Sequence, residues 1–395
     1  MRTETLHPGA ILFVRIVIMQ LKAMVIGSGW AAEGHCVALR TAGVEVAALC
    51  GRSPVPTQAL AQKLGIPAVR VEWRSAIQEL RPDIVAIATP AGPHADVAVA
   101  AAELGCNVFC EKPLGVDAAA ARTMLTAAVG AGVKHAYGAT SCLSPAIALV
   151  RDLLADGRIG TLASLETSAH FGVSFPFAHS WFHELSQGGG MLNNLFTHKL
   201  AQVLRLTGGT PAHVAGEARS FINRAPVAPP IHDFRELFRP ITDVDETDPT
   251  RWRPADADTV YAVILELALP TGGEVTARFD ASLTSKSRED ETLTLCGTKG
   301  TFVLTGGNSP SQVHHYDFKR DNWEQLSVSQ SGDETEARVE DAVQRDWNTL
   351  VRQFAADIRG ETHGFYPTFE DGWLAAEIID IVRAGRARSP IPLRP

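Results

Sequence analysis

The segment Gly27–Ala32 constrains the fold of this chain more than any other feature. It reads Gly-Ser-Gly-Trp-Ala-Ala and lies between an apolar run that ends at Ile26 and an alanine-rich stretch of helical length. In a strand–turn–helix setting, the first glycine permits a tight turn, the second lets the backbone approach a pyrophosphate, and a small third residue keeps the helix close to the strand. Glycines also serve ordinary turns, but a helix N-terminus here would attract phosphate groups. The pattern therefore predicts a dinucleotide site formed by Gly27, Ser28, Gly29, Trp30 and Ala31.

Short apolar runs alternate with alanine-rich stretches over residues 19–142. The predicted strands are Leu21–Ile26, Val44–Cys50, Ala68–Glu72, Ile84–Ala88, Asn107–Cys110 and His135–Ala139. Helical stretches between them include Ala31–Ala42, His94–Leu104 and Asp117–Ala131. Because such alternation produces right-handed βαβ units, we expect an α/β fold here, a Rossmann domain with a doubly wound parallel sheet.

The pattern changes after Cys142, and residues 143–395 are predicted to form a second, α+β domain that binds substrate and mediates oligomerisation. The expected helices are Pro145–Ala155, Met191–Leu206, 339–358 and 369–384. The expected strands are Leu162–His170, Val260–Leu269, Glu274–Ala281, Glu291–Cys296 and Thr301–Leu304. Successive strands joined by hairpins indicate a large, mostly antiparallel open sheet.

Two segments fit neither domain pattern. Residues 223–257 are rich in proline and charge and show no hydrophobic period, so we predict a mobile cover over the substrate crevice. Residues 1–18 precede Met19, where a chain of this type would naturally start, and are predicted to be an N-terminal extension without a role in the chemistry.

Charge and cysteine usage exclude several classes of partner. The formal net charge is −8 and no run of lysine and arginine is present, so the surface should repel nucleic acid and anionic lipid. The apolar run Ile11–Ile18 is interrupted by Arg15 and is too short to span a bilayer. The six cysteines are scattered, and no ligand set for zinc surrounds the close pair Cys106 and Cys110. We expect a cytoplasmic protein with no metal, no nucleic-acid partner and no membrane partner.

The end of the second predicted strand bears on the choice of cofactor. An NAD-dependent enzyme usually places Asp or Glu there to bind the ribose 2′-hydroxyl. The residues present are Gly51, which leaves space, Arg52, which offers a cation, and Ser53, which offers a hydroxyl. This set suits a 2′-phosphate, although Arg52 could equally be a solvated loop residue. The cofactor is therefore predicted to be NADP in preference to NAD.

Two further motifs end predicted strands and so face the crevice of an open α/β sheet. Thr89-Pro90 ends the fourth strand, and His94 follows as either a neighbour of the cofactor or a helix-cap residue. Glu111-Lys112-Pro113 ends the fifth strand and brings a lysine to the expected place of the nicotinamide, although by composition it is only a turn. The predicted cofactor residues therefore include Thr89, Pro90, His94, Glu111 and Lys112.

Together these motifs resemble the glucose-fructose oxidoreductase/inositol dehydrogenase/rhizopine-catabolism family. Gly27–Ala32, Thr89-Pro90 with His94, and Glu111–Pro113 stand at the family's intervals. In the second half, the three glycines 188–190 followed by Asn194 and His198 are similar to the family's three glycines, aspartate and histidine, and 296–300 resembles a turn of its sheet. The resemblance covers residues 20–390 approximately. It implies a nicotinamide-dependent oxidoreductase with a Rossmann domain followed by a sheet domain.

Carried over by position, the resemblance implies that Lys112 is the crevice lysine and His198 the acid/base. Asn194 stands where the family usually has an aspartate, so it can hydrogen-bond but carries no charge. Asn194 and His198 are four residues apart on the predicted helix and should point the same way, so we expect Asn194 to orient His198. Phe196 replaces a usual glycine and is expected to crowd the pocket. Both departures weigh against a simple sugar or inositol as substrate.

Three aromatic residues just before the glycines, His179, Trp181 and His183, either line the substrate pocket or pack a loop. The spacing of the two histidines would suit zinc, but no third ligand is evident, and no metal is predicted. The predicted substrate-binding residues are His179, Trp181, His183, Asn194 and His198.

The leading hypothesis is hydride transfer between a nicotinamide cofactor and a carbinol or carbonyl carbon of a sugar, cyclitol or related polyol. Lys112 would hydrogen-bond the reacting oxygen and His198 would exchange its proton. One alternative is an enzyme of the same fold that acts on a dihydrodiol, a tetrapyrrole or an imine. Another is a nucleotide-binding regulator without catalysis. A homodimer or homotetramer is expected.

Overall fold

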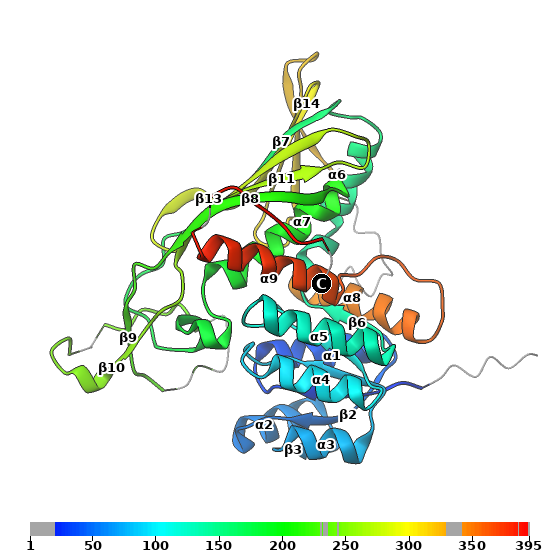
Figure 1. The fold of residues 1–395 in the computed structure, drawn as a ribbon, viewed down its shortest axis with the longest axis vertical. Coiled ribbons are helices and arrows are strands. Elements are labelled where there is room, and N and C mark those ends of the chain that lie inside the picture. Colours follow the sequence, from blue (N-terminus) through cyan, green and yellow to red (C-terminus); the bar gives the residue numbers. More distant parts are fainter. Residues whose placement is uncertain are drawn as a thin grey trace, which may run out of the picture.

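The computed structural model describes residues 20–229, 231, 236–242, 245–328, 342–385 and 387–393. The expected extension, residues 1–18, lies outside the described residues. The two main sheets of the described chain lie along the long axis of the molecule, the smaller at one end and a larger, strongly twisted one at the other (Figure 1).

The first sheet is a six-stranded parallel sheet. Its strands are β1 (Lys22–Ile26), β2 (Glu45–Cys50), β3 (Ala68–Arg70), β4 (Ile84–Ile87), β5 (Asn107–Cys110) and β6 (His135–Tyr137). They are connected by α1 (Trp30–Thr41), α2 (Pro54–Leu64), α3 (Trp73–Leu80), α4 (His94–Glu103) and α5 (Ala118–Ala131). The strand order β3-β2-β1-β4-β5-β6 reverses direction between β1 and β4, which places a ligand crevice at their carboxyl ends. The predicted doubly wound α/β sheet is confirmed.

The second sheet has nine strands in the order β16-β15-β14-β13-β7-β12-β11-β8-β17. Neighbouring strands are antiparallel except β7 and β12, which run parallel, so the predicted mostly antiparallel sheet is confirmed. The strands are β7 (Leu162–Phe171), β8 (Thr210–Arg219), β11 (Val260–Ala268), β12 (Glu274–Ser282), β13 (Lys286–Gly297), β14 (Gly300–Thr305), β15 (Gln312–Asp317), β16 (Asn322–Leu326) and β17 (Ser389–Pro390). Strand β8 was not predicted, because its run of small and polar residues carries a weak hydrophobic signal.

Helices α6 (Pro145–Ala155), α7 (Thr197–Thr207) and α9 (Phe369–Arg383) lie on the side of the large sheet that faces the small one (Figure 1). Helix α9 contacts both α5 of the first domain and β8 of the second. It therefore joins the two domains along their boundary.

Helix α8 (Ala342–Ile358) belongs by sequence to the expected second domain, yet it packs on the small sheet. Its buried residues Trp347, Val351 and Phe354 share one core cluster with Leu21 and Val25 of the first strand region. An amphipathic pattern shows that a helix is half-buried but does not say which sheet it covers. The chain thus returns to complete the first domain near its end.

Residues 223–257 contain regular structure that the sequence did not predict. Strand β9 (Arg224–Pro226) pairs with β10 (Trp252–Pro254) in a two-stranded antiparallel ladder. The backbone N–H of Ile241 donates to the carbonyl of Pro176 at 2.8 Å, which ties the segment to the loop after β7. Residues 230, 232–235 and 243–244 of the expected cover lie outside the described residues.

No helix in the described ranges has both the length and the apolar character to cross a membrane. Helix α8, at 17 residues, is the longest of them.

Candidate active site

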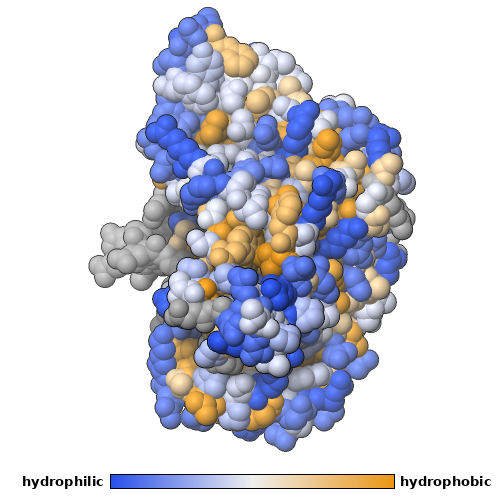
Figure 2. Space-filling model, turned by 90° about the vertical axis from the view of Figure 1, so that its left-hand side faces the viewer, coloured by the Kyte–Doolittle hydropathy of each residue, from blue (hydrophilic) through white to orange (hydrophobic). Residues whose placement is uncertain are grey.

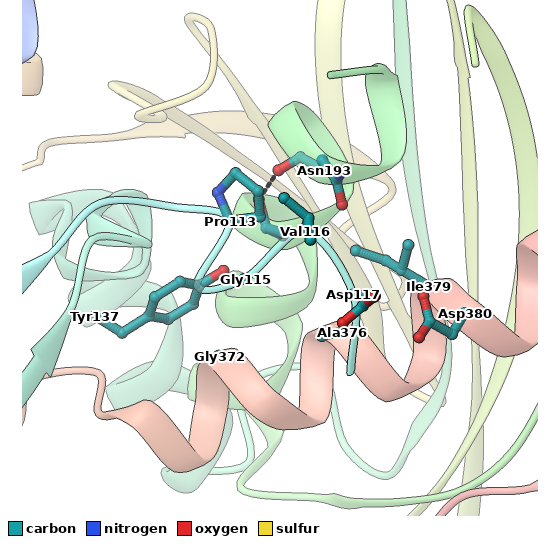
Figure 3. Close-up of a pocket in the computed structure, with 11 residues that line it drawn as sticks. Pro113, Gly115, Val116, Asp117, Tyr137, Asn193, Gly372, Ala376, Ile379 and Asp380 are labelled. Carbon is teal, nitrogen blue, oxygen red and sulfur yellow. Dashed lines mark hydrogen bonds between the residues drawn. The ribbon is translucent and has the colours of Figure 1, made fainter. Parts of the chain in front are cut away.

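A cleft of about 1380 Å³ runs from the glycine turn of the first domain to the large sheet. It is lined by residues from both domains, including Gly27–Ala31, Lys112, Asn194 and His198. On the face of the molecule that carries β9 and β10, hydrophobic side chains gather midway along the long axis (Figure 2). A second gap, between Pro113, Tyr137 and α9 (Figure 3), has no volume for even one water molecule and is not a ligand site.

The turn between β1 and α1 is built for close approach of a ligand. Gly27 has φ +138°, and a Cβ there would lie 2.4 Å from the carbonyl oxygen of Ala88. Gly29 is the N-cap of α1, and no side chain caps the first N–H groups of that helix. Uncapped N–H groups at a helix start are an anion site, so these residues fit the pyrophosphate of a dinucleotide.

The end of the cleft next to β2 and β3 carries charges of both signs. Arg52 and Ser53 are exposed there, beside Gly51, where a Cβ would lie 2.2 Å from Oγ1 of Thr57. Glu72, an exposed acid just after β3, lines the same end. Glu72 was not predicted as a cofactor residue, because it follows the third strand, whereas the ribose acid is expected after the second.

Glu111 is the centre of a buried network behind Lys112. Its Oε1 accepts from Nε1 of Trp347 at 2.8 Å and lies 3.0 Å from Nε2 of His35. Its Oε2 accepts from the backbone N–H of Lys112 at 3.1 Å. Burial alone would raise the pKa of Glu111, but His35, Lys112 and Trp347 outweigh it and lower that pKa to about 2. The carboxylate therefore stays charged and fixes the backbone that presents Lys112.

His94 ties two loops together from beneath the cleft. It is fully buried, with Nε2 3.0 Å from the carbonyl oxygen of Thr89 and Nδ1 3.0 Å from that of Pro113. Thr89 and Pro90 line the cleft, whereas His94 does not. Burial lowers the pKa of His94, although the nearby carbonyl groups counteract it.

Asn194 binds Lys112, not His198. Its Nδ2 donates to the carbonyl oxygens of Gly188 at 3.2 Å and Gly190 at 2.8 Å, and this turns Oδ1 toward Lys112, whose Nζ donates to it at 3.1 Å. The expected contact with His198 is therefore not formed. Leu192–Phe196 is a π-helix, in which residues four apart do not align as they do in an α-helix. Burial lowers the pKa of Lys112, although the Glu111 charge opposes it.

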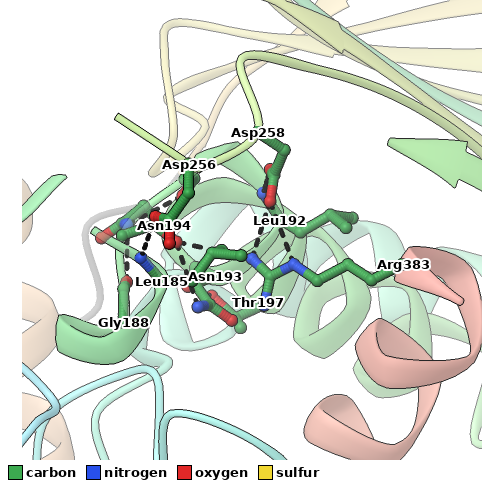
Figure 4. A network of polar contacts seen from close by, with 11 residues as sticks. Leu185, Gly188, Leu192, Asn193, Asn194, Thr197, Asp256, Asp258 and Arg383 are labelled. Carbon is green, nitrogen blue, oxygen red and sulfur yellow. Dashed lines mark hydrogen bonds and ion pairs between the residues drawn. The ribbon is translucent and has the colours of Figure 1, made fainter. Parts of the chain in front are cut away.

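The glycine turn before Asn194 tolerates no side chains. A Cβ on Gly189 would lie 2.4 Å from the carbonyl oxygen of Phe182, and one on Gly190 would lie 2.7 Å from Oδ1 of Asp258. Asp258 accepts from the backbone N–H of Leu192 at 2.8 Å and from Nη2 of Arg383 at 2.7 Å (Figure 4). This network fixes the start of the π-helix and hence the direction of Asn194.

His198 lies in the first turn of α7 and lines the cleft, with 8% of the residue exposed. Its Nδ1 is buried without a hydrogen-bond partner. Burial and, next, the charge of Lys112 lower its pKa to about 3, so the ring is neutral at neutral pH. Phe196 does not crowd this site, because its ring packs on Phe279 in the sheet core at a centroid distance of 4.9 Å.

Of the three aromatic residues predicted to bind substrate before the glycines, Trp181 lines the cleft and the two histidines do not. His179 and His183 stack on each other at 5.4 Å, and His183 is buried. Nε2 of His179 lies 3.2 Å from the carbonyl oxygen of Pro254, the last residue of β10. In the described ranges, no cluster of three or more side chains of His, Cys, Asp or Glu could hold a metal ion.

Known proteins resemble this chain in both domains. Levoglucosan dehydrogenase of Pseudarthrobacter phenanthrenivorans is 30% identical over 151 residues, which are 38% of this chain and 39% of that protein. Inositol 2-dehydrogenase of Rhizobium meliloti is 25% identical over 208 residues, 52% of this chain and 61% of that protein. The matched regions span less than two thirds of either relative. A solved structure of levoglucosan dehydrogenase with NADH and L-sorbose shares the fold, with a TM-score of 0.79 at 21% identity over 95% of this chain and 100% of that one.

Two family models cover most of the chain. Residues 21–139 match the oxidoreductase family with an NAD-binding Rossmann fold. Residues 147–303 match the GFO/IDH/MocA C-terminal domain. The chain therefore belongs to the GFO/IDH/MocA family of oxidoreductases.

Proposed function

We propose that this chain is a nicotinamide-dependent dehydrogenase that interconverts a carbinol and a carbonyl group of a sugar, cyclitol or related polyol. The observation that carries the proposal is that Lys112 and His198 line the same cleft as the glycine turn 27–31. The names of the two relatives, levoglucosan dehydrogenase and inositol 2-dehydrogenase, support a polyol substrate.

The cofactor is proposed to be NADP in preference to NAD. A bound nicotinamide dinucleotide would supply the group that accepts or donates the hydride. The glycine turn and the start of α1 would hold its pyrophosphate, and Arg52 with Ser53 would bind the 2′-phosphate. Glu72 at the same end, and the NADH in the related structure, favour NAD instead, so both cofactors must be compared in solution.

The protein's own groups would handle the charge and the proton at the reacting oxygen. Nζ of Lys112, held by Asn194 and backed by Glu111, would donate a hydrogen bond to that oxygen and stabilise its developing negative charge. The neutral ring of His198 would accept the hydroxyl proton during oxidation and return it during reduction. In this scheme Asn194 is a positioning residue for Lys112.

A panel of sugars, cyclitols and linear polyols, each with NAD and with NADP, tests the proposal through the absorbance of the reduced cofactor. We expect reduction of the cofactor by at least one cyclic polyol, faster with NADP. Tight dinucleotide binding without reduction by any of them would instead favour the regulator, and turnover of a dihydrodiol or an imine alone would favour the non-sugar enzyme.

Residues 143–395 are proposed to bind substrate and to form a homodimer or homotetramer. The outer side of the large sheet supports this, since Ile264 on β11, an interior strand of that sheet, is 48% exposed. Light scattering on protein eluted from a size-exclusion column distinguishes a dimer or tetramer from a monomer.

Residues 223–257 are proposed to cover the crevice, because Leu237 and Phe238 of that segment line the cleft. Limited proteolysis with and without cofactor tests this role.

A further inference from the structure

The cleft has an apolar wall beyond its catalytic end. Its members come from four separate stretches of chain, namely the end of β7 and the loop after it, the turn before the glycines, the cover segment 223–257 and the loop that follows β12. They are Phe171, Val173, Trp181, Phe238 and Leu283. Phe171, Val173, Trp181 and Phe238 are only half-buried, so the described chain leaves part of their apolar surface open to the cleft. Apolar surface gathered in a cleft in this way marks a binding site for an apolar group.

This wall is held in place by contacts behind it. The ring of Phe238 packs on Phe177 and Phe182 at centroid distances of 5.1 and 5.3 Å. The backbone N–H of Val173 donates to the carbonyl of Leu283 at 2.7 Å. A pre-formed wall binds a ligand without first ordering its own side chains, which favours affinity.

An ion pair between Glu291 and Lys199 lies on the core-facing side of the large sheet. Glu291 lies in the row of β13 that continues with the buried Leu293 and Leu295, and its Oε2 is 2.6 Å from Nζ of Lys199. Glu291 is 8% exposed and lines the cleft, while Lys199 is 1% exposed and follows His198 directly. A buried ion pair contributes little to stability compared with apolar side chains of similar size. A carboxylate that lines the cleft can also accept hydrogen bonds from the hydroxyl groups of a ligand.

The pairing of β13 with β7 sets the distance between the two features. Glu291 is opposite Ala169, and Phe171 is two residues further along β7 on the same face of the sheet. Two residues of strand correspond to about 7 Å. Along the strand direction, the backbone positions of Glu291 and of Phe171, at the edge of the apolar wall, are thus offset by roughly the width of a sugar ring.

We propose that the substrate is a cyclic polyol that carries an apolar, aryl-sized substituent, such as an aryl glycoside. Glu291, held by Lys199, accepts hydrogen bonds from ring hydroxyls beside the reacting carbinol. The substituent packs on Phe171, Val173 and Trp181. This inference rests on the proposed dehydrogenase activity and names its substrate class.

Matched pairs of methyl and phenyl β-glycosides of glucose, galactose and xylose test the proposal with the full chain and saturating cofactor. Burial of a phenyl ring should raise kcat/KM about 10- to 100-fold over the methyl glycoside in at least one pair. Ratios below about threefold in every pair that is turned over, or turnover of unsubstituted polyols alone, would overturn the inference and leave the dehydrogenase proposal intact. No cofactor reduction by any glycoside or polyol would overturn the dehydrogenase proposal itself.

Substitutions test whether the preference for the phenyl glycoside arises from residues of the cleft. Phe171→Ala and Trp181→Ala should each reduce the phenyl-to-methyl ratio by at least fivefold. Trp323→Ala is the matched control, since Trp323 is 54% exposed on β16 and does not line the cleft; its ratio should equal that of the wild type. Glu291→Gln should raise KM for both glycosides of a pair without changing their ratio. Each variant is checked by its melting temperature, and a wild-type ratio in both wall variants, with melting unchanged, would refute the assignment.

Discussion

Replacement of Asn194 by Asp tests the geometry of the site most directly. The native amide donates to the carbonyl oxygens of Gly188 and Gly190 and accepts from Nζ of Lys112 at 3.1 Å. A carboxylate cannot donate, so two hydrogen bonds worth about 1 kcal/mol each are lost. In return a full negative charge stands 3.1 Å from the ammonium group. At an effective dielectric constant of about 20, that attraction is about 5 kcal/mol before desolvation of the carboxylate is subtracted.

The new charge should move the pH dependence of the reaction upward. A carboxylate beside Lys112 and near His198 favours the protonated form of both, so it raises both pKa values. The pKa of His198, lowered to about 3 in the native protein, should rise by about 1–3 units. Oxidation needs the neutral ring, and activity is lost as pH falls through the pKa of the ring. The wild type should therefore keep its kcat/KM down to about pH 4, whereas Asn194→Asp should lose it between about pH 4 and 6.

The assay is kcat/KM for polyol oxidation from pH 4 to 10, with dinucleotide binding measured separately by fluorescence. Asn193→Asp is the matched control. Asn193 is buried beside Asn194 and donates to the carbonyl of Gly189 at 3.1 Å, but it does not line the cleft or contact Lys112. The pH at which kcat/KM of Asn193→Asp falls on the acid side of the profile (the acid limb) should stay near that of the wild type, even if the variant is less stable. If the acid limb of Asn194→Asp also stays put, then either Asn194 does not control the charge at this site or His198 does not accept the proton.

The remaining predictions concern the acid/base pair, the cofactor and the return of α8. His198→Ala and Lys112→Ala should each lower kcat by about 10²–10⁴-fold with little change in cofactor affinity, and near-full activity of either variant would remove that residue from the mechanism. Arg52→Ala should weaken NADP binding by about 1.5–3 kcal/mol and leave NAD nearly unchanged in a fluorescence titration; a native protein that binds NAD more tightly refutes the NADP preference. Gly34→Ala would place a Cβ 2.3 Å from the ring of Trp347. Denaturant unfolding should therefore show a free energy of unfolding lower by about 1–3 kcal/mol. Cofactor binding should also weaken, because α8 borders the cleft. Unchanged unfolding would mean that α8 does not pack as described.

Local backbone requirements made much of the fold readable from the sequence. The turn at Gly27 needs a positive φ and a close approach to Ala88, and only glycine meets both requirements without strain. The sequence therefore shows a glycine between an apolar strand and an alanine-rich helix. Strand and helix periods likewise depend on residues a few positions apart. Such signals predicted the parallel sheet, the β11–β12 hairpin and helix α6 at its observed bounds, Pro145–Ala155.

Tertiary structure alone determined the contacts between these elements that form the site. Nζ of Lys112 meets Asn194 across 82 positions, and Trp347 reaches Glu111 across 236. Neither contact has a local period or spacing, because each depends on how helices and sheets pack once the whole chain is folded. The π-helix turned Asn194 away from its expected partner for the same reason, since the network of Asp258 and Arg383 that fixes the start of that helix is assembled from distant segments. The sequence by itself determined which residue types are available, and packing determined which of them touch.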